Sequence, residues 1–105
     1  MKNTITTGAY NVQFLDATAY LDAEEVLLLT GLSSQELAEL ADLGVLQANN
    51  DGRYTAQIVD IGRRAVSLRD TFELDLAGLA LAVRLLARID ALEARLQELS
   101  CQLPR

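Results

Sequence analysis

The sequence predicts a small, mainly helical domain of the winged helix-turn-helix class, with a small β-hairpin and a long C-terminal helix. Three observations support this prediction: two consecutive helix-start signals separated by a glycine, a strong turn sequence after them, and an apolar repeat of three and four residues up to residue 103. The chain has 105 residues, of which 50% are hydrophobic and only 5% aromatic. This length and composition fit one helical domain.

Two short helices are expected first. Over residues 22–31 an aspartate is followed three residues later by a glutamate, which is the spacing of a capping box, and a glycine ends the pattern. Over residues 33–44 a serine and a glutamate repeat the same spacing, and a second glycine ends the helix. Two short helices joined by a tight turn form a helix-turn-helix.

Short strands are expected on both sides of this helix pair. Residues 10–15 alternate apolar and polar side chains, a pattern typical of a half-buried strand. Val45 and Leu46 form a second expected strand, residues 49–52 (Asn-Asn-Asp-Gly) a turn, and residues 53–55 the return strand of a hairpin. A hairpin after a helix-turn-helix makes the arrangement winged.

An amphipathic helix is expected next, because apolar residues from Ile58 to Phe72 recur at intervals of three and four. Gly62 weakens this helix by up to about 1 kcal/mol relative to alanine, but the apolar stripe should hold it. The pattern breaks after Phe72, and Asp75 is a suitable N-cap for the last helix.

The last helix carries heptads, with a positions at 82, 89, 96 and 103 and d positions at 85, 92 and 99. Additional apolar residues in its first half indicate that this half folds back on the domain. After Ile89 the pattern is strictly a and d, so the second half needs another chain to cover it. We therefore expect a homodimer formed through Leu85, Ile89, Leu92, Leu96 and Leu99.

The charges beside this seam bear on its orientation. Arg88 occupies a g position and Glu93 the following e position, which favours a parallel pair. An antiparallel pair would place Arg88 near other g residues such as Arg95, but two charges do not decide the matter. The chain is thus expected to comprise a flexible N-terminus (1–9), a winged helix-turn-helix domain (10–75) and a dimerisation arm (76–105).

The composition argues against several function classes. The chain has no histidine and one cysteine, Cys101, and its six glycines are scattered. The usual zinc, haem, catalytic-triad and phosphate-loop sites are therefore not expected, and we predict neither cofactor, metal nor enzymatic activity. No apolar run follows Lys2 and none is long enough to cross a bilayer, so a cytoplasmic protein without membrane contact is expected.

The net charge of −6 is unevenly distributed. Residues 1–52 contain one basic and eight acidic residues, for a charge of −7, whereas residues 53–105 contain eight arginines and seven acids, for a charge of +1. The second short helix carries no basic residue, and its polar face holds carboxylates. A recognition helix normally brings basic side chains to DNA phosphates, so this helix is unsuited to the usual docking.

An acidic docking surface for a basic protein partner explains this pattern better. Its candidate residues are Glu24, Glu25, Glu36, Glu39 and Asp42. The alternative is a DNA-binding patch formed by Arg53, Arg63, Arg64 and Arg69. We expect these arginines instead to form ordinary ion pairs, because Asp60 lies four residues before Arg64.

Several segments resemble known proteins. Residues 29–33 (Leu-Thr-Gly-Leu-Ser) and 43–46 (Leu-Gly-Val-Leu), with Glu36-Leu37 between them, resemble the opening of a MerR-type winged helix. Residues 63–69, 72–82 and 85–89, above all the pattern Leu-Asp-x-x-Gly-Leu-Ala-Leu-Ala, resemble the CbpM chaperone modulators, which are small MerR-like proteins. The resemblance covers about residues 10–99. Members of this family carry a tryptophan near the return of the hairpin, where this chain has Arg53-Tyr54.

The resemblance implies a function. CbpM proteins bind the J-domain of the co-chaperone CbpA, block its use with Hsp70 and reduce its DNA binding. J-domains present a basic helix to Hsp70, which an acidic surface would complement. We therefore expect an inhibitor of a J-domain co-chaperone without direct nucleic-acid binding. A MerR-like transcription regulator, or a subunit that uses the leucine seam for a different partner, are the alternatives.

Overall fold

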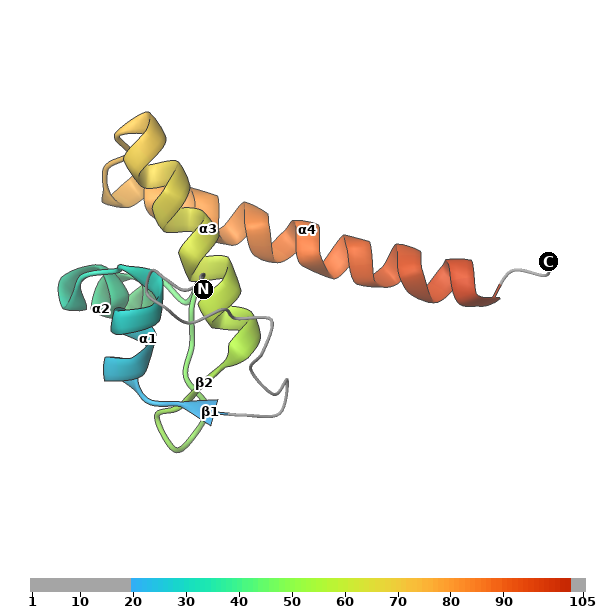
Figure 1. Cartoon of the computed structure of the whole chain (residues 1–105), viewed down its shortest axis with the longest axis horizontal. Coiled ribbons are helices and arrows are strands. Elements are labelled where there is room, and N and C mark those ends of the chain that lie inside the picture. Colours follow the sequence, from blue (N-terminus) through green and yellow to red (C-terminus); the bar gives the residue numbers. More distant parts are fainter. Residues whose placement is uncertain (1–19, 103–105) are drawn as a thin grey trace, which may run out of the picture.

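The structure is a computed structural model that describes residues 20–102. Its elements follow one another along the chain as β1 (Tyr20–Leu21), α1 (Ala23–Thr30), α2 (Ser34–Asp42), β2 (Tyr54–Thr55), α3 (Ala56–Phe72) and α4 (Leu76–Gln102). A compact head contains everything up to the first part of α4, and the rest of α4 projects from it (Figure 1). The expected strand at residues 10–15 and the expected flexible N-terminus lie outside the described residues.

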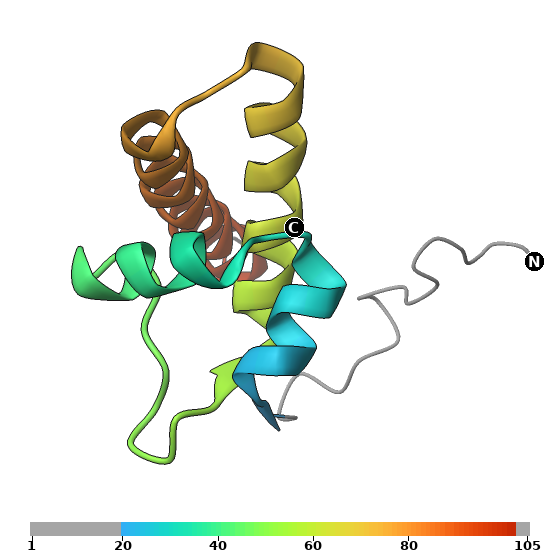
Figure 2. The same ribbon diagram turned by 90° about the vertical axis from the view of Figure 1, so that its left-hand side faces the viewer.

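The helix-turn-helix is confirmed with both capping boxes. The Glu25 amide donates to Asp22 Oδ1 at 2.8 Å, and the Asp22 amide donates back to Glu25 Oε1 at 3.0 Å. Ser33 and Glu36 repeat this exchange at the start of α2. Gly31 ends α1 in the left-handed conformation, with φ +87°, which a residue with a Cβ adopts only at a cost. The chain thus turns between the two helices at the glycine that the sequence pattern indicated, and α2 runs across the direction of α1 (Figure 2).

The small antiparallel sheet is present, but the predicted hairpin pairing is wrong. β2 pairs with β1, in the register Tyr20 with Thr55 and Leu21 with Tyr54. Val45 and Leu46 form no strand. The sheet therefore joins the segment before α1 to the segment before α3, and it closes the head at its base in Figure 1.

The backbone of Val45 and Leu46 is used for another purpose. Both amides donate to the Leu40 carbonyl, at 3.0 and 3.4 Å, and so help to end α2. The Leu46 side chain is buried in the core, with 3% of its surface exposed. The turn at residues 49–52 forms as expected, because the Asn49 side-chain oxygen accepts from the amides of Asp51 and Arg53. The turn is therefore predicted correctly, but the strand that follows it, β2, pairs with β1 and not with residues 45–46.

The core lies where α3 packs against α1 on one side and against the first part of α4 on the other (Figures 1 and 2). Leu40, Leu79, Val26, Val59 and Val83 are its largest fully buried side chains. Gly62 lies directly against the end of α1, because a Cβ on it would lie 2.8 Å from Thr30 Cγ2. The glycine that weakens α3 as an isolated helix therefore lets α1 pack against it.

The long final helix is confirmed and begins as predicted. The Asp75 side chain accepts from the Gly78 amide at 2.9 Å, in the manner of an N-cap. Leu79, Ala80, Ala82 and Val83 are buried, whereas every residue from 91 to 102 is exposed. The first part of α4 therefore belongs to the core, although the division of the chain at residue 75 into domain and arm remains a prediction. We refer to residues 91–102 as the arm.

Candidate partner-binding surfaces

The outward face of α2 carries two carboxylates. Leu37 and Leu40 are buried against the core. With 3.6 residues per turn, Glu39 and Asp42 lie on the opposite side of the helix, where Asp42 is exposed and Glu39 partly exposed. Within residues 20–102 neither carboxylate forms an ion pair. We call this pair of residues the acidic α2 face.

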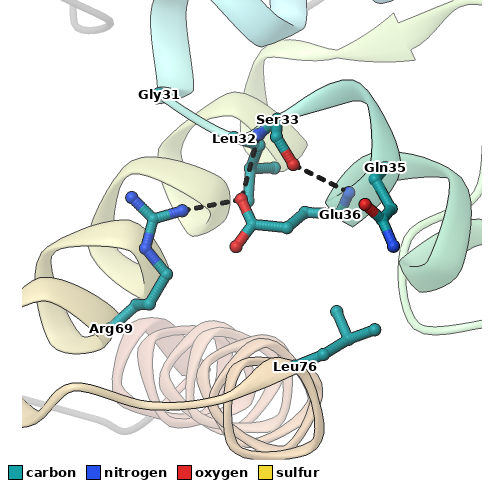
Figure 3. A pocket seen from close by; sticks show the side chains of 7 residues that line it. All are labelled: Gly31, Leu32, Ser33, Gln35, Glu36, Arg69 and Leu76. Atoms are coloured by element: carbon teal, nitrogen blue, oxygen red, sulfur yellow. Dashed lines mark hydrogen bonds and ion pairs between the residues drawn. The ribbon is translucent and has the colours of Figure 1, made fainter.

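Glu36, a third candidate on the same helix, is held by its own chain. One of its carboxylate oxygens, Oε1, accepts from the Ser33 amide at 2.9 Å and from Arg69 Nη1 at 2.6 Å. These contacts line a depression of about 520 Å³, with Leu76 on its opposite side (Figure 3). Glu36 therefore joins α2 to α3 and is a positioning residue rather than part of an open charged surface.

Glu24 and Glu25, the remaining acidic candidates, are not on the acidic α2 face. They lie in the first turn of α1, whereas Asp42 ends α2, and the two helices are joined at their other ends (Figure 2). Glu25 is also engaged in the capping box. The structure thus brings Glu39 and Asp42 together and separates them from the acidic residues at the start of α1.

The arginines on α3 are largely neutralised by carboxylates. Arg64 Nη2 lies 2.9 Å from both carboxylate oxygens of Asp90 and 3.1 Å from Asp60 Oδ2. The hydrogen bonding that Arg64 donates to Asp90 is the main reason that the pKa of Arg64 is raised. Arg69 pairs with Asp70 at 3.0 Å and with Glu36, and both raise the pKa of its guanidinium. The expected ion pair between Asp60 and Arg64 is confirmed.

These pairs weaken the basic surface that DNA binding would need. Arg53, in the turn before β2, and Arg63 on α3 are exposed. The positive charge of Arg64 and Arg69 is offset by four carboxylates on α2, α3 and α4. Phosphate binding by these two residues would require a partner to compete with contacts that already exist.

An apolar stripe runs along α4 on the side away from the head. Its members are more than 40% exposed and follow one another at intervals of three and four: Leu81, Leu85, Ile89, Leu92, Leu96 and Leu99. All five candidate dimerisation residues are thus on one open surface. Leu81 was not among the residues predicted for this surface. It precedes the first heptad, and nothing in the sequence distinguishes it from the leucines that are buried in the core.

No group of three or more potential metal ligands occurs among residues 20–102. No described helix is long and apolar enough to cross a membrane. The acidic α2 face and the apolar stripe on α4 are therefore the surfaces that we consider for function.

Comparisons with a family model and with curated proteins agree on one family for this chain. A family model described as "MerR HTH family regulatory protein" matches residues 21–101. The "Chaperone modulatory protein CbpM" of Salmonella arizonae is 33% identical over 85 residues, which cover 77% of this chain and 84% of that protein. The protein of the same name from Salmonella paratyphi A is 35% identical over 66 residues, and the match spans 65% of its length and 59% of this chain.

Neither name denotes an enzyme. No solved structure matches the chain significantly. The match to the family model covers both the helix-turn-helix and nearly all of α4, which are the two parts that carry the surfaces described above. The chain therefore belongs to the CbpM family of MerR-type helix-turn-helix proteins.

Proposed function

We propose that this protein is a chaperone modulator that binds the J-domain of a CbpA-like co-chaperone through the acidic α2 face. Binding would cover the J-domain surface that Hsp70 uses, and so inhibit the co-chaperone and reduce its DNA binding. The observation that carries this proposal is the placement of Glu39 and Asp42 on the outward side of α2, at the position where a DNA-binding relative needs basic side chains.

The charge of this face suits a basic helix as its partner. Two carboxylates on consecutive turns attract lysines and arginines during encounter and repel the phosphates of DNA. Since neither carboxylate is paired within residues 20–102, a partner does not first have to displace a cation of this part of the chain.

The face is also held rigidly. Leu37 and Leu40 anchor α2 in the core, and the contact of Glu36 with Arg69 fixes the start of the helix against α3. A surface that keeps its shape loses little conformational entropy when it binds. Glu36 therefore supports binding indirectly, by orienting Glu39 and Asp42.

Charge reversal on the acidic α2 face tests the proposal. We expect the double variant Glu39→Lys, Asp42→Lys to slow association with a CbpA-like J-domain by roughly tenfold or more, because attraction is replaced by repulsion. The measurement is the association rate by surface-based or stopped-flow kinetics over a series of salt concentrations. The difference from the parent protein should shrink as salt screens the charges.

A matched control separates local contact from net charge. The variant Asp51→Lys, Glu98→Lys changes the net charge equally at two exposed positions outside α2. Its association rate should stay within about threefold of the parent, because charges farther than a Debye length are screened. Equal effects of the two variants would contradict the assigned face. Absence of J-domain binding, together with duplex DNA binding that weakens steeply with salt, would favour the transcription regulator instead.

A further inference from the structure

We infer that Leu43, at the end of α2, is the apolar anchor of the acidic α2 face, so that the face takes a partner helix on which an apolar and a basic side chain lie one turn apart. This inference rests on the proposed function and adds the chemistry by which the partner is recognised. It depends on the exposure of Leu43, on the turn that holds it and on the charges beside it.

Leu43 is an apolar residue that the core leaves outside. It exposes 53% of its surface, whereas Leu40, three residues earlier, is fully buried. The last turn of α2 lies at the outer edge of the head (Figures 1 and 2), so this leucine is open to another protein. A complex that covers Leu43 gains stability because apolar surface is removed from water.

The backbone around Leu43 is held by the turn that ends α2. The Leu43 amide donates to the Glu39 carbonyl at 2.9 Å, and the Gly44 amide donates to the Ala41 carbonyl at 3.0 Å. Gly44 is in the left-handed conformation, with φ +76°, and the chain turns there so that Leu46 is buried in the core. Leu43 is therefore fixed on the outside, and its backbone loses little conformational entropy when it binds.

The two carboxylates of the acidic α2 face lie beside this leucine. Leu43 comes four residues after Glu39, so the two side chains are neighbours on the surface of the helix, and Asp42 directly precedes it. An apolar side chain bordered by charges is the usual composition of an interface, which has an apolar centre and a polar edge. A partner helix matches this arrangement when a lysine or arginine stands three or four residues from an apolar side chain.

The end of α2 adds to the negative charge at this point. The C-terminal end of a helix carries a partial negative charge that basic side chains normally offset, but the last turn of α2 contains no basic residue. It contains Glu39 and Asp42, and neither forms an ion pair within residues 20–102. Like charges therefore meet beside Leu43, which lowers the stability of the head and attracts a cation of the partner to the same place.

Substitution of Leu43 tests its role as the anchor. Leu43→Ser should raise the dissociation rate of the complex with an isolated CbpA-like J-domain by roughly tenfold or more, at low and at high salt alike, because an apolar contact is lost. Leu43→Met keeps an apolar side chain of similar size and should stay within about threefold of the parent. Surface-based or stopped-flow kinetics on the full chain measure both rates.

A matched control removes a leucine elsewhere on the head. Leu28, on α1, exposes 76% of its surface, and Leu28→Ser should leave the dissociation rate within about twofold of the parent. Circular dichroism should show the helix content of the parent in both serine variants, because substitutions at exposed positions change stability little. An unchanged dissociation rate in Leu43→Ser, or equal effects of the two serine variants, would overturn the inference.

Neutralisation of Asp42 tests the charge beside the anchor. Asp42→Asn should raise the thermal unfolding midpoint by about 2–4 °C, because it removes a like charge from the end of the helix. The same variant should associate with the J-domain more slowly, by a factor that shrinks as salt is added. A residue with a structural role lowers stability when it is changed, so a lower midpoint for Asp42→Asn would contradict the assigned role.

The variants keep this inference separate from the proposed function. If Glu39→Lys, Asp42→Lys slows association while Leu43→Ser dissociates like the parent, the proposed function stands and only the anchor is wrong. If the parent does not bind the J-domain at all, the proposed function is wrong and this inference with it. The expected result is slower association in the charge variants and faster dissociation in Leu43→Ser.

Discussion

The two parts of α4 have similar apolar spacing but opposite environments. In the part up to Asp90, one side is buried against α3 and the other carries exposed leucines, whereas in the arm every residue is exposed. The same helix thus belongs to the core at one end and lies entirely outside it at the other. The contact of Asp90 with Arg64 of α3 marks the transition between the two.

This difference shows that an apolar repeat identifies the apolar faces of a helix but does not identify which segment packs against each face. Leu79 and Leu99 are both leucines at helical spacing, yet 0% of the first is exposed and 55% of the second. The width of the apolar surface distinguishes them. The first part of α4 has apolar residues on two sides, one packed against α3 and one exposed to solvent. The large apolar residues of the arm lie in one narrow row.

Removal of a core leucine should give the largest effect on stability. Leu79→Ala should lower the free energy of unfolding by about 3 kcal/mol, because a fully buried side chain leaves a cavity. Leu99→Ala, made together with Leu92→Glu and Leu96→Glu so that charges keep the exposed leucines from pairing with another chain, should change it by less than about 0.5 kcal/mol. Chemical denaturation followed by circular dichroism measures both. Similar losses would mean that the arm packs against the head of its own chain.

An added methyl group at Gly62 should have the next largest effect. Alanine is the better helix former by up to about 1 kcal/mol, but its Cβ would lie 2.8 Å from Thr30 Cγ2. We expect Gly62→Ala to destabilise the head by about 1–2 kcal/mol, since overpacking outweighs propensity. A higher thermal unfolding midpoint for Gly62→Ala would contradict this expectation, because it would show that α1 and α3 can move apart to accommodate the methyl group.

A second substitution checks that this contact is the cause. Thr30→Ser removes the crowded methyl but keeps the hydroxyl, which donates to the Val26 carbonyl at 2.7 Å. It should restore part of the stability lost in Gly62→Ala, and the two changes should be clearly non-additive in a double-mutant cycle. If the losses of the two single variants simply add in the double variant, the strain in Gly62→Ala does not arise from contact with Thr30.

Loss of the ion pair at the transition should give the smallest effect. Asp90→Asn should lower the free energy of unfolding by about 1 kcal/mol, because Arg64 keeps Asp60 but loses two charge-assisted hydrogen bonds at a partly exposed site. Glu93→Gln, one turn later in the arm, should be neutral within about 0.5 kcal/mol when Leu92→Glu and Leu96→Glu are also present. Equal losses of stability in the two variants would show that the part of α4 packed against the head extends beyond Asp90.

Local signals in the sequence predicted most helix boundaries correctly. Capping boxes at Asp22 and Ser33 and the N-cap at Asp75 depend on residues at most three positions apart, so their geometry is nearly complete in the sequence. The partner of β2 could not be found in this way. The pairing of Tyr54 with Leu21 spans two helices, and Val45 and Leu46 appeared equally suitable for a strand.

The candidate acidic surface was predicted only in part for the same reason. Periodicity placed Glu39 and Asp42 opposite the buried face of α2, and the structure agrees. The commitment of Glu36 to Arg69 joins residues 33 positions apart, and the contact of Arg64 with Asp90 joins residues 26 apart. Ion pairs over such distances follow from how the helices pack, which no local pattern in this chain specifies.

The sequence by itself determined the helices, their caps, the turn before β2 and the two faces of α4, because each depends on hydrogen bonds or periodicity within a few residues. Only the tertiary structure decided which strand pairs with β2, why a glycine stands at position 62 and which side of α4 stays open. Those outcomes depend on close packing between distant segments. The same packing joins two arginines of α3 to carboxylates and leaves Glu39 and Asp42 on the outward side of α2, without an ion pair among residues 20–102.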